Sequence, residues 1–146
     1  MNDSKTALKL WVVLARAFNA VQQRMGEDVS RHGLTLAEFA VLEALYHKGP
    51  LLLGDVQKKV LVSSGGVTYL IDRLADRGLV RRKLCAEDRR ARYAELTEEG
   101  KAQMDRIWPE HAHCIADVMS ALNSDDQREA VRVLRELGVG AAAETV

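Results

Sequence analysis

Residues 53–97 read LGDVQKKVLVSSGGVTYLIDRLADRGLVRRKLCAEDRRARYAELT, and the rest of the chain is organised around them. The stretch predicts a short helix over 54–60, a tight connection and a second helix. Ser63 and Ser64 can cap the second helix, because hydroxyl side chains accept hydrogen bonds from the free N–H groups of a first turn. The apolar residues of that helix follow the i, i+3, i+4, i+7 spacing of one buried face. They are Val67, Leu70, Ile71 and Leu74.

A basic hairpin is predicted after the second helix. Gly78 ends the helix, since glycine is favoured just past a helix end. Residues 80–85 and 92–97 then have the pattern of two strands around a charged tip. A helix-turn-helix followed by such a hairpin is a DNA-reading arrangement. Its second helix fits the major groove, and an arginine at the hairpin tip can reach the backbone or the minor groove.

The distribution of charge supports this interpretation. The chain has a formal net charge of zero, but residues 57–92 hold ten basic and four acidic residues, whereas residues 93–146 hold five basic and eleven acidic ones. Positive charge confined to one motif is typical of nucleic-acid contact. The alternative is a solvated basic surface, which does not explain why the charge coincides with the motif.

The N-terminal part predicts two helices. Residues 5–32 carry an apolar stripe at helical spacing, which we expect to be core, and Gly33 closes that helix. Thr35 and Glu38 form a capping box, in which a hydroxyl and a carboxylate satisfy each other's backbone N–H groups. The helix that they open runs to His47. The stripe of the first helix comprises Trp11, Leu14, Ala15, Phe18, Val21, Met25 and Val29.

Two further helices are predicted after the hairpin. Thr97 caps a long one, and Pro109 lies inside it and should kink it. Residues 124–127 form a second capping box for a final helix that ends at Gly138. Apolar positions of the long helix recur in alternating steps of four and three, a heptad seam typical of helices that pack against a partner. They are Met104, Trp108, His111, Ile115, Val118 and Leu122.

The predicted fold class is mainly α with a small β-hairpin: a winged helix-turn-helix core flanked by N- and C-terminal dimerisation helices. We assign residues 34–97 to the DNA-binding lobe, residues 5–33 and 98–138 to a helical dimerisation region, and residues 139–146 to a flexible tail. The terminal helices are too apolar to stand alone in water, so we expect a two-fold homodimer in which they interlock. Such a dimer predicts a double-stranded, pseudo-palindromic operator, with two recognition helices one duplex turn apart.

Composition and sequence pattern indicate the cellular location of the protein. It contains no run of 18 apolar residues and no secretory signal pattern, so we expect no membrane partner and a cytoplasmic location. Its two cysteines, Cys85 and Cys114, do not make a disulfide framework.

A family motif lies in the hairpin. Asp88 and Arg90, followed after five residues by Leu96 and Thr97, match the pattern D-x-R, five residues, L-T. Together with the run DRGLV at residues 76–80 and the order of the helices, this motif resembles the MarR family of winged helix-turn-helix transcriptional regulators. The resemblance spans roughly residues 8–137.

The resemblance implies roles by position. Residues at the start of the second helix would lie at the major groove, and Arg90 would enter the minor groove, steadied by Asp88. Tyr69 departs from the pattern, because many members have arginine there, and this leaves the base preference open. The DNA-binding candidates are Ser63, Ser64, Thr68, Tyr69, Arg73, Asp88, Arg89, Arg90 and Arg92.

Residues 85–90 and 108–111 resemble the branch of the family that responds to quinones, phenolics or oxidants. We therefore expect a repressor that a small aromatic or phenolic ligand, or an oxidant, releases from DNA. Cys85 is the redox candidate, since Lys83 and Arg89 can stabilise a thiolate; alternatively it is a plain strand residue. The effector-pocket candidates, which could equally be core, are Trp11, Phe18, Phe39, Tyr46, Trp108 and His111.

Three other functions fit the sequence less well. An enzyme is disfavoured, because the chain has no nucleophile–base pair, no phosphate loop and no H-E-x-x-H motif. A winged-helix protein-interaction module without DNA binding would not need the basic hairpin. A metal-responsive regulator needs three or four ligands, whereas His111 and Cys114 supply two on one helix face. We therefore expect no metal and no cofactor.

Overall fold

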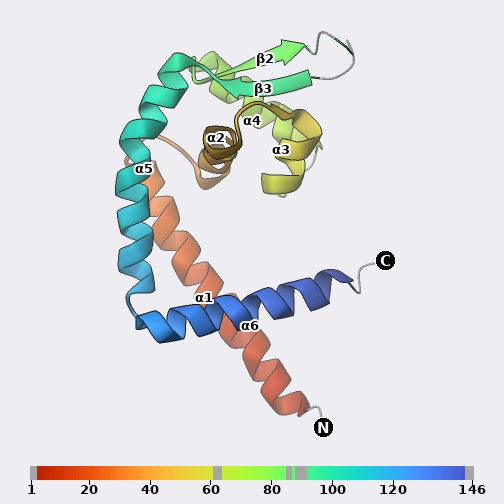
Figure 1. Cartoon of the computed structure of the whole chain (residues 1–146), viewed down its shortest axis with the longest axis vertical. Coiled ribbons are helices and arrows are strands. Elements are labelled where there is room, and N and C mark those ends of the chain that lie inside the picture. Colours follow the sequence, from red (N-terminus) through yellow and green to blue (C-terminus); the bar gives the residue numbers. More distant parts are fainter. Residues whose placement is uncertain (1–2, 61–63, 85–86, 88–91, 144–146) are drawn as a thin grey trace. The chain divides into compact units, whose positions relative to one another are not determined.

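The computed structural model describes residues 3–60, 64–84, 87 and 92–143. Within these ranges the chain forms six helices and three short strands (Figure 1). It divides into two compact units, Met1–His111 and Ala112–Val146, which are described separately. Among the described residues, no helix has the length and apolar character needed to cross a membrane.

Helix α1, Ser4–Ser30, starts where the side chain of Asp3 accepts a hydrogen bond from the N–H of Lys5. The expectation that its apolar stripe is core is wrong for most of its length. Val29 is fully buried, whereas Trp11 and Phe18 are 67% and 62% exposed. Helical periodicity identifies an apolar face, but it does not say whether another part of the chain covers that face.

Helix α2, Leu36–Lys48, begins with the predicted capping box. The N–H of Glu38 donates to Thr35 Oγ1, and the N–H of Thr35 donates to Glu38 Oε1, both at 3.1 Å. The helix ends at Gly49, whose φ of 77° lies in the left-handed region that favours glycine.

Helices α3, Leu53–Val60, and α4, Ser64–Asp76, form the predicted helix-turn-helix pair. The four apolar residues predicted for the inner face of α4 are all buried. Gly78 has a φ of 76° and donates its N–H to the carbonyl of Ala75, so it ends α4 as expected.

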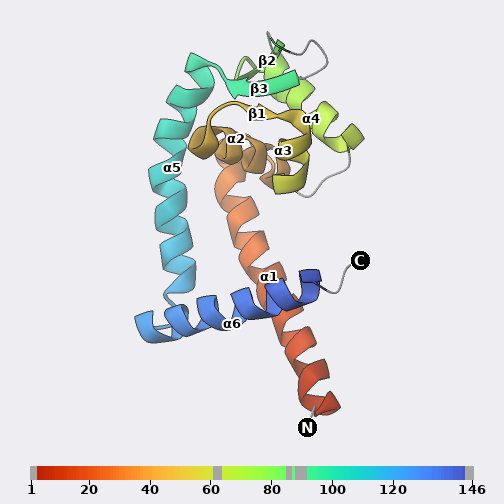
Figure 2. The same cartoon turned by 45° about the vertical axis from the view of Figure 1, so that its right-hand side comes forward.

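The wing is a three-stranded antiparallel sheet of order β1–β3–β2. Strands β2, Val80–Leu84, and β3, Arg92–Leu96, are the predicted hairpin. Strand β1, Leu51–Leu52, was not predicted, because two residues are too short to show a strand period. Figure 2 shows it beside β3, where its residues pair with Ala94 and Tyr93.

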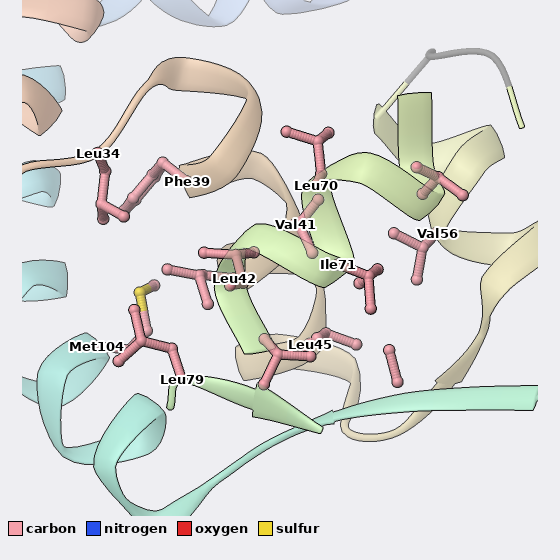
Figure 3. Packing of buried hydrophobic residues seen from close by; sticks show 14 of the residues in the cluster. Leu34, Phe39, Val41, Leu42, Leu45, Val56, Leu70, Ile71, Leu79 and Met104 are labelled. Atoms are coloured by element: carbon pink, nitrogen blue, oxygen red, sulfur yellow. The ribbon is translucent and has the colours of Figure 1, made fainter. Parts of the chain in front are cut away.

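The core of the first unit lies where α2 and α4 meet, closed by the start of β2 and the first half of α5. Figure 3 shows Leu42 and Leu45 of α2, Ile71 of α4 and Met104 of α5 converging on this core. The inward face of α4 is thus buried, and its opposite face is exposed to solvent.

Helix α5, Glu98–Met119, is capped by Thr97 as predicted. Thr97 Oγ1 accepts the N–H of Gly100 at 3.0 Å and donates to the carbonyl of Gly78 at 2.6 Å. The heptad seam is only partly available to a partner, because Met104 and His111 are buried within the chain. Pro109 lies inside the helix as predicted.

Helix α6, Ser124–Ala143, differs from the prediction at both ends. Asn123, and not Ser124, is its N-cap, since Asn123 Oδ1 accepts the N–H of Asp126 at 2.8 Å. The helix also continues five residues past Gly138, so neither Gly138 nor Gly140 ends it. The tail predicted from residue 139 is therefore helical through Ala143.

Candidate nucleic-acid interface

The exposed face of α4 carries Thr68, Tyr69 and Arg73. Tyr69 and Arg73 are one helical turn apart and touch each other. Arg73 Nη1 donates to the Tyr69 hydroxyl at 3.2 Å, and the guanidinium carbon lies 5.7 Å from the centre of the ring. The pair thus presents an aromatic face and a cation together on the outer side of the predicted recognition helix.

The charge state of Arg73 is secure. The hydrogen bond with Tyr69, followed by the charges of Tyr69 and Glu38, raises the pKa of Arg73 above its already high usual value. The guanidinium therefore stays protonated at every physiological pH, as a contact to DNA requires.

A buried carboxylate lies behind this pair. Glu38 is 2% exposed, and its Oε2 lies 3.5 Å from Arg77 Nη1 and 3.9 Å from Arg73 Nε. Arg77 Nη1 also donates to the carbonyl of Gly33 at 2.9 Å. The first turn of α2 and the last turns of α4 are thus joined through charge as well as through apolar packing.

Two ion pairs organise the base of the wing. Arg81 Nε contacts Glu95 Oε1 at 2.7 Å across β2 and β3, and Arg82 Nη2 contacts Asp72 Oδ1 at 2.9 Å between β2 and α4. The second pair ties the wing to α4. Arg92, a predicted DNA contact, is exposed at the start of β3.

Several predicted site residues lie outside the part of the chain that the structure describes. They include most of the wing tip, and the expectations for them stay predictions. Ser64 begins α4, but its side chain is likewise not described. The residues outside are Ser63, Cys85, Asp88, Arg89 and Arg90.

Four of the six effector-pocket candidates come together. The rings of Phe39 and His111 are 4.4 Å apart between centres, and those of Trp108 and His111 are 6.1 Å apart. His47, which the sequence did not single out, joins the group, with its ring 4.4 Å from Trp108 and 5.2 Å from Tyr46. The other two candidates, Trp11 and Phe18, are exposed on α1 and are not part of these ring contacts.

His111 is held by a carboxylate that the sequence did not reveal as functional. His111 Nδ1 donates to Asp28 Oδ2 at 2.8 Å, and Arg31 Nη2 donates to Asp28 Oδ1 at 2.5 Å. Burial by itself would raise the pKa of Asp28, but the hydrogen bonds and charges of His111 and Arg31 outweigh it and hold that pKa below 3.8. The one signal in the sequence was an aspartate beside Val29, on the face of α1 that is buried.

The metal-responsive alternative gains no support from this arrangement. The described residues contain no group of three or more His, Cys, Asp or Glu side chains placed to hold a metal ion. His111 directs its Nδ1 to Asp28, and Cys114 is a half-buried free thiol.

The three-helix core, the small sheet and the exposed Tyr69–Arg73 pair of α4 define a winged helix-turn-helix protein. Residues 32–91 match the model of the MarR family. The HTH-type transcriptional regulator MhqR of Bacillus subtilis is 37% identical over 138 residues, covering 94% of this chain and 95% of the relative. The uncharacterised regulator YkoM of the same organism is 40% identical over 137 residues, covering 94% and 89%. The chain belongs to the MarR family of DNA-binding transcriptional regulators.

A solved structure supports the same fold. BpsR of Bordetella bronchiseptica superposes with a TM-score of 0.80 at 27% sequence identity, covering 89% of this chain and 98% of that protein. The DNA binding of BpsR is regulated by 6-hydroxynicotinic acid. MhqR and YkoM are named as transcriptional regulators.

Proposed function

We propose that this protein is a homodimeric repressor that a small aromatic or phenolic ligand releases from a pseudo-palindromic operator. The observation that carries the effector part is the cluster of Phe39, Trp108 and His111, which contains a buried, hydrogen-bonded histidine. The DNA part is supported by the exposed pair of Tyr69 and Arg73 on α4.

The α4 pair suits contact with a base pair and with the backbone. A guanidinium can bind guanine through two hydrogen bonds or neutralise a phosphate, and an aromatic ring can pack on a thymine methyl group. Tyr69 occupies the position at which many members carry arginine, so its operator preference should differ from theirs.

The DNA part is tested with a duplex selected from a random-sequence pool by the wild-type protein. Arg73→Ala should weaken binding by about 1–3 kcal/mol if it reads a base. If it neutralises a phosphate, the slope of log K against log salt should fall by about 0.9. Arg128→Ala is the matched control, since it removes the same charge from α6, where Arg128 pairs with Asp125. Equal effects of the two variants would contradict a DNA-reading role for Arg73.

The ring cluster has the chemistry of a site for a hydroxylated aromatic ligand. Phe39 and Trp108 offer apolar faces to a ligand. His111 offers its second ring nitrogen, because its Nδ1 is already bonded to Asp28. Because His111 joins α5 to α1 and α2 through Asp28 and Phe39, a ligand that takes over its contacts would disturb the packing of these three helices. The precedent of BpsR supports a ligand of this class.

Fluorescence tests the effector part. Trp11→Phe leaves Trp108 as the single tryptophan, because the chain has two. Titration with 6-hydroxynicotinic acid, simple phenols and quinones should quench Trp108 and release the selected duplex. His111→Gln should no longer respond to the ligand, and because it also loses the ring contacts with Phe39 and Trp108, its affinity for the duplex without ligand should already be lowered. If no compound alters either signal, the effector part fails and the DNA part stands.

An oxidant acting through Cys85 is the other release mechanism within this proposal. Peroxide should then release the wild-type protein and the Cys114→Ser variant, but not Cys85→Ser. Release of all three would exclude Cys85 as the sensor.

A further inference from the structure

Glu38 uses its two carboxylate oxygens for different tasks. Oε1 accepts the N–H of Thr35 and completes the cap of α2. Oε2 is buried and has no hydrogen-bond partner within the described residues, although two guanidinium groups lie within 4 Å of it. Helix capping requires one oxygen, so it does not account for the placement of the second.

The two arginines near Oε2 have different surroundings. Arg77 Nη1 donates to the carbonyl of Gly33, so this arginine has a second anchor besides Glu38 Oε2, which lies 3.5 Å away. Arg73 lies between Glu38 and the surface: its Nε edge faces the buried carboxylate, and its Nη1 donates to the exposed hydroxyl of Tyr69. A long side chain that is half exposed, as Arg73 is, otherwise samples many rotamers.

We propose that Glu38 is a positioning residue that orients Arg73 for operator recognition and so sets the specificity of the protein for its operator. The inference rests on the proposed role of the α4 face in reading DNA. Ordering Arg73 before binding reduces the entropy lost on contact with the correct base. The negative charge of Glu38 also weakens the attraction to phosphate that every DNA sequence shares. Ordering Arg73 raises the ratio of operator affinity to non-specific affinity, whereas the charge lowers both affinities alike.

Glu38→Gln separates a positioning role from a simple charge effect, because the two predict opposite changes in affinity for the selected duplex. Glutamine keeps an oxygen that can accept the N–H of Thr35, but it removes the charge that attracts Arg73. If Glu38 acted only as a charge, the variant would bind all DNA more tightly. If it positions Arg73, affinity for the selected duplex should fall about 10-fold, a typical cost of losing one specific contact. Affinity for a scrambled duplex of the same composition should stay the same or rise.

The measurement is fluorescence anisotropy with both duplexes at two salt concentrations, and the quantity compared is the ratio of the two affinities. Thr35→Ala is the matched control, since it removes the hydroxyl half of the same cap and leaves the carboxylate in place. It should lower the melting temperature without changing the ratio. An equal fall of the ratio in Thr35→Ala would attribute the effect to the cap and overturn the proposal.

A double-mutant cycle tests the route through Arg73. In the Arg73→Ala background, Glu38→Gln should have no further effect on the ratio. Additive effects would overturn the proposal. Arg73→Lys provides a test that does not alter the buried site: it keeps the charge but lacks the planar group that faces both Glu38 and Tyr69. It should also lower the ratio, and an unchanged ratio would overturn the proposal.

Failure of the inference differs from failure of the proposed function. If the wild-type protein selects no duplex, the proposed operator binding fails and the inference fails with it. If it selects a duplex and Glu38→Gln binds both duplexes more tightly, operator binding stands and the positioning role is wrong.

Discussion

Asp28 shows how one buried charge can link helices that lie far apart in the sequence. It is 2% exposed and accepts hydrogen bonds from His111 on α5 and Arg31 just after α1. A buried carboxylate stabilises a fold only while such partners compensate for the loss of water. The three side chains should therefore behave as a unit whose strength depends on pH.

Asp28→Asn should lower the free energy of unfolding by about 1–3 kcal/mol at neutral pH. Because the folded state holds the pKa of Asp28 below 3.8, this contribution is present above that pH and is lost as the pH falls through the lowered value. Urea unfolding at neutral pH and at about pH 3 checks the sign, since the difference between the two proteins should shrink in acid. A difference that grows in acid would contradict the assigned direction.

Gly100 is required by a close approach of two backbone segments. A Cβ at this position would lie 2.0 Å from the carbonyl oxygen of Leu79. Gly100→Ala should therefore lower the free energy of unfolding by about 3 kcal/mol, at the upper end of overpacking costs. Gly54→Ala in α3 is the control, because a Cβ there meets nothing within 4 Å. It should be stabilising by up to about 1 kcal/mol in denaturant titrations.

At the scale of elements, the connection between α5 and α6 relies on side-chain caps. Asn123 Oδ1 caps the start of α6, and Gln127 Nε2 donates to the carbonyls of Met119 and Leu122 at 3.0 Å each. Carbonyls at the end of α5 and in the turn that follows it, and an N–H group at the start of α6, thus have side-chain partners.

Asn123→Ala should weaken the start of α6 by about 1 kcal/mol, whereas Ser124→Ala should leave it nearly unchanged. Amide hydrogen exchange of residues 124–127 measures the difference directly. The opposite result would restore Ser124 as the cap that the sequence predicted.

At the scale of the whole molecule, the terminal helices expose large apolar side chains. Leu8, Trp11 and Phe18 of α1 are each more than 60% exposed, and Leu134 and Leu137 of α6 are each more than 40% exposed. Large apolar side chains gathered on an exposed helix commonly mark an interaction site. A second copy of the chain is the occupant that the proposed function requires, because each half of a palindromic operator needs one recognition helix.

Sedimentation at micromolar concentration should give about twice the chain mass of 16.2 kDa. Leu134→Glu should shift the protein toward monomer and weaken operator binding, because a buried unpaired carboxylate opposes association. Arg135→Glu is the control for this test, because it places the same side chain one position along α6 at another exposed residue. A monomeric wild-type protein would rule out the two-half-site arrangement.

The helix-turn-helix, the hairpin and the capping box of Thr35 and Glu38 could all be predicted from the amino-acid sequence. The helices and the cap depend on residues within about seven positions of one another, where helical spacing and cap chemistry act locally. The hairpin pairs two strands that follow each other in the sequence, from Leu84 with Arg92 to Val80 with Leu96. The cap of α6 was misplaced by one residue, because asparagine and serine are both good caps and stand side by side. The family assignment also followed from local motifs in their order.

Other features depended on the tertiary structure. The hydrogen bond between Asp28 and His111 spans 83 positions, and the ion pair between Glu38 and Arg73 joins two helices that only packing brings together. The sequence also did not predict that β1 pairs with β3 or that much of the α1 stripe is exposed. Periodicity shows which face of an element is apolar, whereas the partner of that face is selected by the packing of the entire core.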